Sequence, residues 1–353
     1  MAGGDARPFE DLYAGLASPR AGAASALATL ERSPHYARAL RYFETRPTRS
    51  LMAPVGCALL YHLTRILGAK AVLEIGTYRA GSTEAIAMAI AAEGGIVITL
   101  DPNGQRDALV RETIAAWPEP MRAATQYHNH SSATFFDQLE LGQKLAFDLI
   151  VVDGYHEYGY ALFDMTMAAK YARPGAIMIV DDFVLPEVFW AARDFASAHP
   201  DWTVVGDVFA RVDPDRPFET QRPSLPGTNF VIFVAPLAIE LGPRPKVVHY
   251  PALEISGIRG LDLGFAPGNP AGALHALAIL RASAPLPALP EQLHRHLGMV
   301  VVPGVSSQLL LIDPPLRTDR NIDRSLELQL IFRPTEGDAR LVLAGPPELL
   351  PAP

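Results

Sequence analysis

The chain has 353 residues, of which 49% are hydrophobic and 19% are charged, and its formal net charge is −8. This length and composition are typical of a globular protein with room for two domains. The negative charge and the lack of a block of Lys and Arg argue against a nucleic-acid partner, because binding to phosphates depends on clustered cations. The single cysteine, Cys57, excludes an intramolecular disulfide framework and fits a reducing compartment.

No segment has the pattern of a signal peptide, and none is apolar over enough residues to cross a bilayer. The sequence therefore predicts a soluble cytoplasmic protein with no membrane partner. The sequence is compatible with a homo-oligomer.

Three regions follow one another along the chain. Residues 1–68 carry helical spacing broken by prolines and end at the stop signal Gly68, which predicts an N-terminal helical cap. Residues 69–238 alternate between strands and helices, which predicts an α/β domain with a doubly wound, Rossmann-like parallel sheet. Residues 239–353 are rich in proline and in short β-like runs, which predicts a smaller β-rich domain.

The elements of the middle region follow from its apolar runs. Runs rich in Val, Ile and Leu predict buried strands, and the segments between them have helical character. The expected strands are Ala71–Ile75, Ile96–Leu100, the run that ends at Asp153, the run Ala176–Val180, Trp202–Phe209 and Asn229–Val234. The expected helices are Thr83–Ala91, Asp107–Ala116, Tyr158–Tyr171 and a segment around Glu187–Ala198. The proline-rich stretch 213–227 is too long for a tight hairpin and is a candidate flap.

Acidic residues end two of these buried runs. Asp153 follows the first run, and the pair Asp181-Asp182 follows the second. Ligands of parallel α/β sheets collect outside the carboxyl ends of the strands, so these carboxylates indicate a divalent-metal cradle. The competing interpretation is that Asp181-Asp182 cap the helix that begins near Pro186.

A glycine-containing turn follows the strand Ala71–Ile75. Gly76 and Gly81 allow close approach of the backbone to a ligand, and Ser82 or Thr83 can cap the following helix. The next strand ends in Asp101, the position from which nucleotide-binding folds hold ribose hydroxyls. The turn does not have the Gly-x-Gly-x-x-Gly pattern, which makes a dinucleotide the less favoured ligand.

Several of these motifs together resemble a known family in order and in spacing. The segments are Glu74-Ile-Gly-Thr-Tyr, Ser82-Thr83, Asp101, Phe147-Asp-Leu-Ile-Val-Val-Asp153-Gly-Tyr-His156-Glu-Tyr158 and Pro174-Gly-Ala-Ile-Met-Ile-Val-Asp181-Asp182. They resemble class I S-adenosylmethionine-dependent O-methyltransferases, in particular the metal-dependent branch that includes catechol and macrolide-sugar O-methyltransferases. The resemblance covers residues from Leu51 to Pro236 and implies a seven-stranded methyltransferase sheet.

The resemblance implies roles for individual residues. For S-adenosylmethionine it implies Glu74, Gly76 and Thr77 at the methionine side, Ser82 near the carboxylate, Asp101 at the ribose and Ser132 in a segment that borders the adenine. For the metal it implies Asp153, Asp181 and Asp182, where the asparagine-bearing relatives carry Asn at the last position. For the catalytic base it implies His156, three residues after Asp153.

Elementary chemistry supports these roles. Methyl transfer from a sulfonium depends on alignment of nucleophile, carbon and sulfur, and a divalent cation lowers the pKa of a bound hydroxyl. Three hard oxygen ligands favour Mg²⁺ or Mn²⁺ over Zn²⁺. His156 can receive a proton near neutral pH, although an ordinary loop histidine would fit the same sequence. Asp164 on the following helix is left outside the predicted site.

Two functions of different class follow. The first is metal-dependent transfer of a methyl group from S-adenosylmethionine to a hydroxyl of a small molecule, such as a sugar or a natural-product scaffold. The second is a non-catalytic module that keeps the cofactor fold for sensing or assembly, with the β-rich domain as its partner surface. The three acids together with His156 favour the enzyme. The β-rich domain carries no recognisable catalytic cluster, and we expect it to stabilise or dimerise the protein, with substrate recognition as the less favoured alternative.

Overall fold

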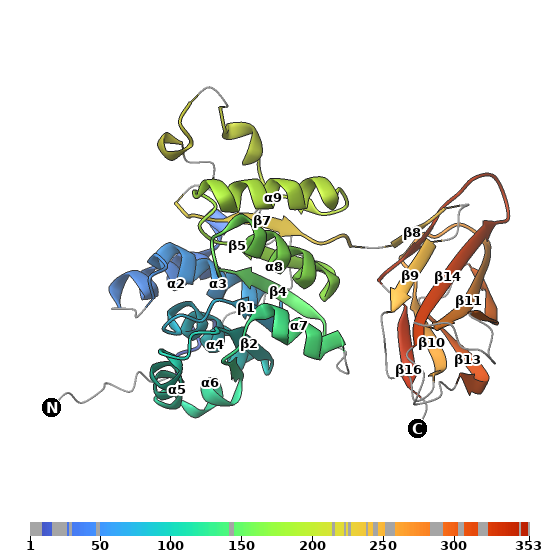
Figure 1. Cartoon of the computed structure of the whole chain (residues 1–353), viewed down its shortest axis with the longest axis horizontal. Coiled ribbons are helices and arrows are strands. Elements are labelled where there is room, and N and C mark those ends of the chain that lie inside the picture. Colours follow the sequence, from blue (N-terminus) through green and yellow to red (C-terminus); the bar gives the residue numbers. More distant parts are fainter. Residues whose placement is uncertain are drawn as a thin grey trace. The chain divides into compact units, whose positions relative to one another are not determined.

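A computed structural model shows how the chain folds (Figure 1). It describes residues 9–15, 27, 30–46, 50–140, 145–213, 216–221, 224, 227–237, 239–242, 246–250, 258–282, 292–302, 307–316, 324–345 and 347–351. The chain divides into two compact units, the first of residues 1–136 and 145–236 and the second of residues 137–144 and 237–353. Among the described residues, no helix is long and apolar enough to span a bilayer.

A seven-stranded sheet forms the centre of the first unit, in the order β3-β2-β1-β4-β5-β7-β6. Its strands are β1 Ala71–Ile75, β2 Ile96–Leu100, β3 Thr125–His128, β4 Phe147–Val152, β5 Ala172–Val180, β6 Thr203–Val204 and β7 Val231–Val234. The pairs from β3 to β5 are parallel, whereas β7 runs antiparallel to both β5 and β6. The seven-stranded, Rossmann-like sheet predicted from the sequence is confirmed.

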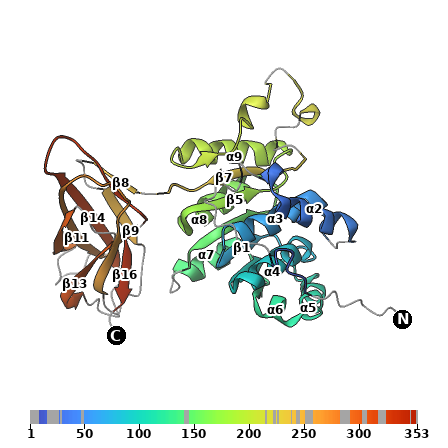
Figure 2. The same ribbon diagram turned by 180° about the vertical axis from the view of Figure 1, so that it is seen from behind.

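Helices cover both faces of this sheet (Figures 1 and 2). The helices are α2 Pro34–Thr45, α3 Pro54–Ile66, α4 Gly81–Glu93, α5 Asp107–Ala115, α6 Glu119–Ala123, α7 Ser132–Glu140, α8 Tyr158–Lys170 and α9 Pro186–Ala198, with short 3-10 turns at Leu30–Arg32, Phe209–Arg211 and Phe218–Thr220. Helix α3 packs against α2 and α4 in one layer, and α8 packs against α9 in the other. The helices expected in the N-terminal cap are therefore α2 and α3.

Burial explains why the strands read as continuous apolar runs. Alternate residues of β1, β2 and β4 enter the core beneath α3 and α4, among them Val72, Val97 and Leu149, while residues between them such as Leu73 are equally buried from the opposite face. A strand covered on both faces needs apolar side chains at every position. The polar exceptions therefore stand out, because a buried polar group needs a partner or a function.

The second unit is made of β-strands. They are β8 Ile239–Leu241, β9 Lys246–Tyr250, β10 Ile258–Gly264, β11 Gly272–Ala282, β12 Gln292–Val302, β13 Ser307–Leu316, β14 Arg324–Pro334, β15 Leu341–Leu343 and β16 Glu348–Pro351. They form the sheets β13-β10-β16, β12-β11-β14-β9 and β15-β8, in which every pairing is antiparallel. Its core contains Leu261, Leu274 and Leu328. The expected β-rich C-terminal region is confirmed.

The structure adds β3, α6 and α7, which were not among the expected elements, and it departs from the expectation in other places as well. The sheet is mixed, because β7 returns antiparallel at its edge. The run Trp202–Phe209 forms a strand only at Thr203–Val204, and a 3-10 turn begins at its last residue, Phe209. The expected strand at the other end of this connection begins two residues late, at Val231. Part of the candidate flap, at 214–215, 222–223 and 225–226, lies outside the described residues.

Candidate active site

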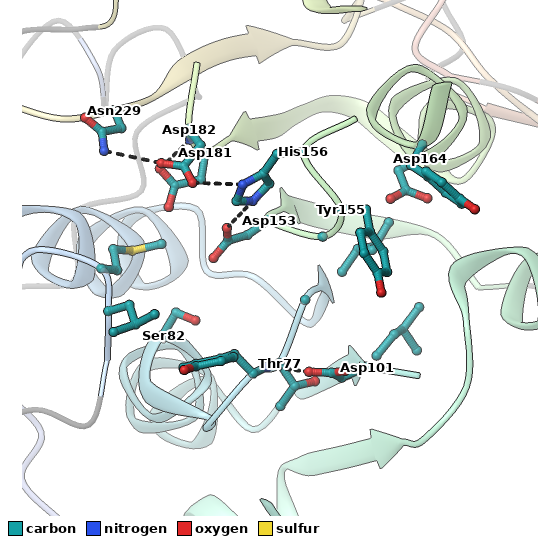
Figure 3. A pocket seen from close by; sticks show the side chains of 18 of the residues that line it. Thr77, Ser82, Asp101, Asp153, Tyr155, His156, Asp164, Asp181, Asp182 and Asn229 are labelled. Carbon is teal, nitrogen blue, oxygen red and sulfur yellow. Dashed lines mark hydrogen bonds and ion pairs between the residues drawn. The ribbon is translucent and has the colours of Figure 1, made fainter. Parts of the chain in front are cut away.

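A cavity of about 1850 Å³ opens at the carboxyl ends of β1, β2, β4 and β5 (Figure 3). This is the edge at which the sequence predicts chemistry, because the loops after parallel strands converge there. All predicted site residues except Glu74 line this cavity: Gly76, Thr77, Ser82, Asp101, Ser132, Asp153, His156, Asp181 and Asp182. The structure therefore brings the predicted donor residues and the predicted metal residues into a single space.

The turn after β1 packs directly on the loop after β4. Gly76 has φ +108, and a Cβ on it would lie 1.9 Å from the carbonyl oxygen of Asp153. Only glycine fits this close approach of two backbones. The turn that is expected to hold the donor is thereby joined to the strand end that carries the first acid.

Glu74 lies behind this turn and does not reach the cavity. Its side chain is 0% exposed, and its Oε2 accepts hydrogen bonds from the hydroxyls of Thr83 and Thr99, each at 2.6 Å. Thr99 in turn lies 2.6 Å from the hydroxyl of Thr77, which lines the cavity. Burial raises the pKa of Glu74 to about 7. The structure thus places Glu74 as a support for Thr77 and α4, in place of the direct cofactor contact that the resemblance implied.

Asp101 at the end of β2 is held by the backbone. Its Oδ2 accepts from the amide of Tyr78 at 2.8 Å, and its Oδ1 accepts from the amide of Asn103 at 2.9 Å. Arg106 approaches Oδ2 at 3.7 Å. A carboxylate oxygen can accept more than one hydrogen bond, so these contacts fix the orientation of Asp101 and leave acceptor capacity toward the cavity.

Three side chains converge between the ends of β4 and β5. Nε2 of His156 lies 3.6 Å from Oδ1 of Asp153, and Nδ1 of His156 lies 3.1 Å from Oδ2 of Asp182. Potential ligand atoms of Asp153, His156 and Asp182 lie within 4.8 Å of one another, the arrangement expected of a cation site. His156 therefore stands between two carboxylates that the sequence assigned to a metal.

Asp181 is oriented differently from its neighbour. It is 9% exposed, and its Oδ1 accepts from the amide of Asp182 at 2.7 Å. Asp182 adopts φ +51, in the left-handed region, which turns its side chain away from the strand direction. The group of ligand atoms within 4.8 Å thus contains His156 and not Asp181, although Asp181 lines the same cavity (Figure 3).

The carboxylates of this cluster repel one another. Burial raises the pKa of Asp153, and burial together with the charge of Asp153 raises the pKa of Asp181 to about 7. The hydrogen bond to Asp153 and the charge of Asp182 raise the pKa of His156, against the effect of burial. Buried acids that repel one another are stabilised by any cation between them, so these residues fit a divalent ion.

Sequence reasoning missed two residues of the site. Asp164 on α8 is 3% exposed and lines the cavity, and Asn229 before β7 donates from Nδ2 to Oδ1 of Asp182 at 3.4 Å. A signal for Asp164 was present, because it lies on the stripe Ala161, Asp164, Met165 and Ala168 that α8 buries. Asn229 had no such signal, since its position depends on the return of β7 along β5.

Residues 73–183 match a family model described as a methyltransferase domain. No curated protein matches the chain. Among solved structures, the chain is similar to an O-methyltransferase from Bacillus cereus in complex with SAH, at 20% identity and TM-score 0.41, over 59% of this chain and 90% of that chain. It is also similar to the O-methyltransferase TomG from Streptomyces achromogenes, involved in tomaymycin synthesis, in complex with SAM, at 22% identity and TM-score 0.41, over 60% of this chain and 89% of that chain.

The matched segment runs from β1 to the residue that follows Asp182, so it contains the turn at Gly76, Asp101, Asp153, His156 and both acids after β5. It carries most of the residues on which the sequence resemblance rested. Residues 73–183 of this chain are thus a methyltransferase domain, as that resemblance predicted.

Proposed function

We propose that the protein transfers a methyl group from S-adenosylmethionine to a hydroxyl of a small molecule in a reaction that requires Mg²⁺ or Mn²⁺. The observation that carries this proposal is the shared cavity, in which the donor turn and the carboxylate cluster are joined through the contact of Gly76 with Asp153. Catalysis of methyl transfer depends on placing the acceptor oxygen in line with the methyl group and sulfur. A rigid junction between the two sites supports that placement.

The donor side of the cavity offers groups matched to the parts of S-adenosylmethionine. The hydroxyl of Ser82 at the start of α4, with the helix N-terminus behind it, suits a carboxylate. Thr77 is held by the hydrogen-bond chain through Thr99 to Glu74, and Asp101 presents acceptors for ribose hydroxyls. Ser132 lies at the start of α7, where the purine base would extend.

The metal would be held by Asp153, Asp181 and Asp182, with His156 as the neighbouring group. When bound, such an ion polarises a substrate hydroxyl and lowers its pKa. In the protein, His156 lies between Asp153 and Asp182, where its ring bridges two negative charges. If Asp153 and Asp182 held a cation, one ring nitrogen of His156 would be available to accept the proton of the acceptor hydroxyl.

The acceptor is proposed to be a hydroxylated small molecule, such as a sugar or a natural-product scaffold. Pockets for drug-sized ligands usually have volumes of about 300–1,000 Å³, so a cavity of about 1850 Å³ has room for the donor and for an acceptor. Apolar residues near the acids, including Met52, Val55 and Phe230, line this space beside the polar Ser224 and Thr228. This mixture suits a scaffold that has both apolar and hydroxyl-bearing faces.

The test separates donor binding from turnover. Calorimetric titration of Asp153→Ala with S-adenosylmethionine should give nearly the parent affinity, because the donor residues lie at Gly76 and Asp101. Production of S-adenosylhomocysteine from a panel of sugars and hydroxylated aromatic compounds should require Mg²⁺ or Mn²⁺ in the parent and vanish in this variant. Asp201→Ala, on an exposed turn, is the matched control. Full turnover of Asp153→Ala in the presence of a chelator would refute the metal-dependent mechanism.

His156 has its own test. His156→Ala should slow methyl transfer while binding of both the donor and the metal persists, because Asp153, Asp181 and Asp182 remain. A rate equal to that of the parent at every pH would assign the base to another group.

A further inference from the structure

Asp164 is a buried acid that the proposed mechanism does not use. It lies on α8, is 3% exposed, and lines the cavity together with its neighbours Phe163 and Tyr160. Carboxylates are almost never buried to this degree unless they have a partner. The hydroxyl of Ser132 is such a partner, because it donates to Oδ1 of Asp164 at 2.5 Å.

The two side chains together present hydrogen-bond acceptors. An ionised carboxylate accepts and cannot donate, and a serine hydroxyl has one proton. That proton of Ser132 is committed to Asp164, which leaves lone pairs on both residues for a ligand. A group that meets them must therefore supply N–H or O–H donors.

The surroundings of Asp164 hold it at the cavity wall. Its Oδ2 would lie 3.2 Å from a Cβ at Gly154, so the absence of a side chain at 154 makes room for this carboxylate. In the described part of the chain, no arginine or lysine forms an ion pair with it. Burial raises the pKa of Asp164 to about 6, against the effect of the Ser132 hydroxyl. The carboxylate is thus short of donors in the protein alone.

The position of Asp164 matches one end of a long ligand. Figure 3 shows Asp164 on the side of the pocket away from Asp181, Asp182 and Asn229, with Tyr155 between them. Asp101, which is placed for ribose hydroxyls, also lies away from those acids. In a donor whose sulfur faces Asp153 and whose ribose meets Asp101, the group beyond the ribose is the purine base.

We propose that Asp164, oriented by Ser132, accepts a hydrogen bond from the 6-amino group of the donor's purine and so makes the protein selective for 6-aminopurine over 6-oxopurine donors. This inference rests on the proposed function, since it assigns a residue to one end of the same donor site. A 6-oxo group would set an acceptor oxygen against the acceptors of Asp164 and Ser132. Sites built to hydrogen-bond a ligand group reject analogues that leave buried polar atoms unpaired.

The experiment compares two donor products by calorimetric titration, S-adenosylhomocysteine and its deaminated 6-oxo analogue S-inosylhomocysteine. The parent should bind the 6-amino compound at least about 30-fold more tightly. Asp164→Asn keeps the shape of the side chain and can turn an NH₂ donor toward a 6-oxo group. We expect this variant to bind S-adenosylhomocysteine at least about 10-fold more weakly than the parent does. Its preference for S-adenosylhomocysteine over S-inosylhomocysteine should fall to about 5-fold or less. Asp137→Asn, on the exposed side of the helix that carries Ser132, should behave as the parent does.

The outcomes separate the two proposals. If the parent does not bind S-adenosylhomocysteine, the proposed function fails and this inference fails with it. If the parent binds it but Asp164→Asn, folded by circular dichroism, keeps the full preference, the inference alone is wrong. If Asp164→Asn does not fold, the test uses the parent protein and a third compound that has hydrogen at position 6 of the purine. An affinity that decreases from the 6-amino compound to the 6-hydrogen compound and then to the 6-oxo compound supports the inference. Equal affinity for all three compounds overturns it.

Discussion

The backbone carbonyl oxygen of Asp153 lies against Gly76, where a Cβ would stand 1.9 Å from that oxygen. The end of β1 and the end of β4 therefore meet through main-chain atoms. Side-chain rotation cannot relieve a contact of this kind, so the relative placement of the donor turn and the first acid is fixed by the sheet itself.

Gly76→Ala should be strongly destabilising. The substitution adds a methyl group that meets the Asp153 carbonyl, and it also imposes φ +108 on a residue that has a side chain. We expect the free energy of unfolding to fall by more than about 3 kcal/mol. Gly94→Ala is the matched control, because Gly94 has φ +65 and nothing lies within 4 Å of its Cβ position. It should cost roughly 1–2 kcal/mol for backbone strain alone. Equal losses in urea denaturation would show that the contact with Asp153 is unimportant.

Asp182→Asn tests whether charge or shape makes the cation site. Asn tolerates the left-handed conformation about as well as Asp, so the turn at φ +51 should persist. The variant loses one negative ligand and the ion pair of His156 with Oδ2. Mn²⁺ affinity, measured by electron paramagnetic resonance, should fall about 10–100-fold while S-adenosylhomocysteine affinity is kept. Asp194→Asn on α9 is a control outside the cavity. Unchanged Mn²⁺ affinity in Asp182→Asn would remove Asp182 from the ligand set.

Glu74 should make the first unit less stable as the pH rises. Its pKa is raised from 4.5 to about 7 by burial, so the folded protein binds its proton more tightly than the unfolded chain does. The resulting stability is fully present below pH 4.5 and is lost as the pH rises through about 7. Over that window the loss amounts to roughly 3 kcal/mol.

Glu74→Gln removes this titration. The amide oxygen can still accept from Thr83 and Thr99, so the fold should be kept. Urea denaturation between pH 5 and 8 should show the variant gaining stability relative to the parent as the pH rises. For Glu112→Gln, on the exposed side of α5, the free energy of unfolding should change with pH as it does in the parent. If Glu74→Gln also shows the pH dependence of the parent, the carboxyl of Glu74 is not protonated in the folded protein at pH 5.

The sequence was sufficient where a single local pattern determines the structure. Apolar runs without alternation predicted β1 and β2 to the residue, because strands buried on both faces tolerate little else. The acids after β4 and β5 were placed at the cavity by the rule that parallel strands end together. The same rule brought Asp101 to the other side of the donor turn.

The sequence was insufficient where contacts between distant segments determine the position of a side chain. Glu74 was expected at the cofactor, but the fold directs its side chain beneath the turn to Thr99 of the neighbouring strand. The insertion of His156 between Asp153 and Asp182 depends on the left-handed backbone of Asp182, a conformation that Asp tolerates but that the sequence alone does not place at this residue. The role of Asp164 depends on Ser132, which the chain places on another helix.

The last prediction concerns the independence of the two units. The core beneath α3 and α4 and the core of the β-rich unit share no residue. The amide of Ala235 donates to the carbonyl of Ala176, and the amide of Gly175 donates to the carbonyl of Pro236, so the first unit needs the chain through Pro236.

A protein that ends after Pro236 should therefore fold and bind S-adenosylhomocysteine with an affinity within about two-fold of that of the full chain. One that ends after Phe230 loses β7 and should not fold, since Val231–Val234 fill a buried position beside β5. Calorimetry of the full chain should show one transition that the protein ending after Pro236 retains and one that it lacks. If donor binding disappears with the β-rich unit while the first transition persists, that unit contributes to the donor site and is more than a stabilising appendage.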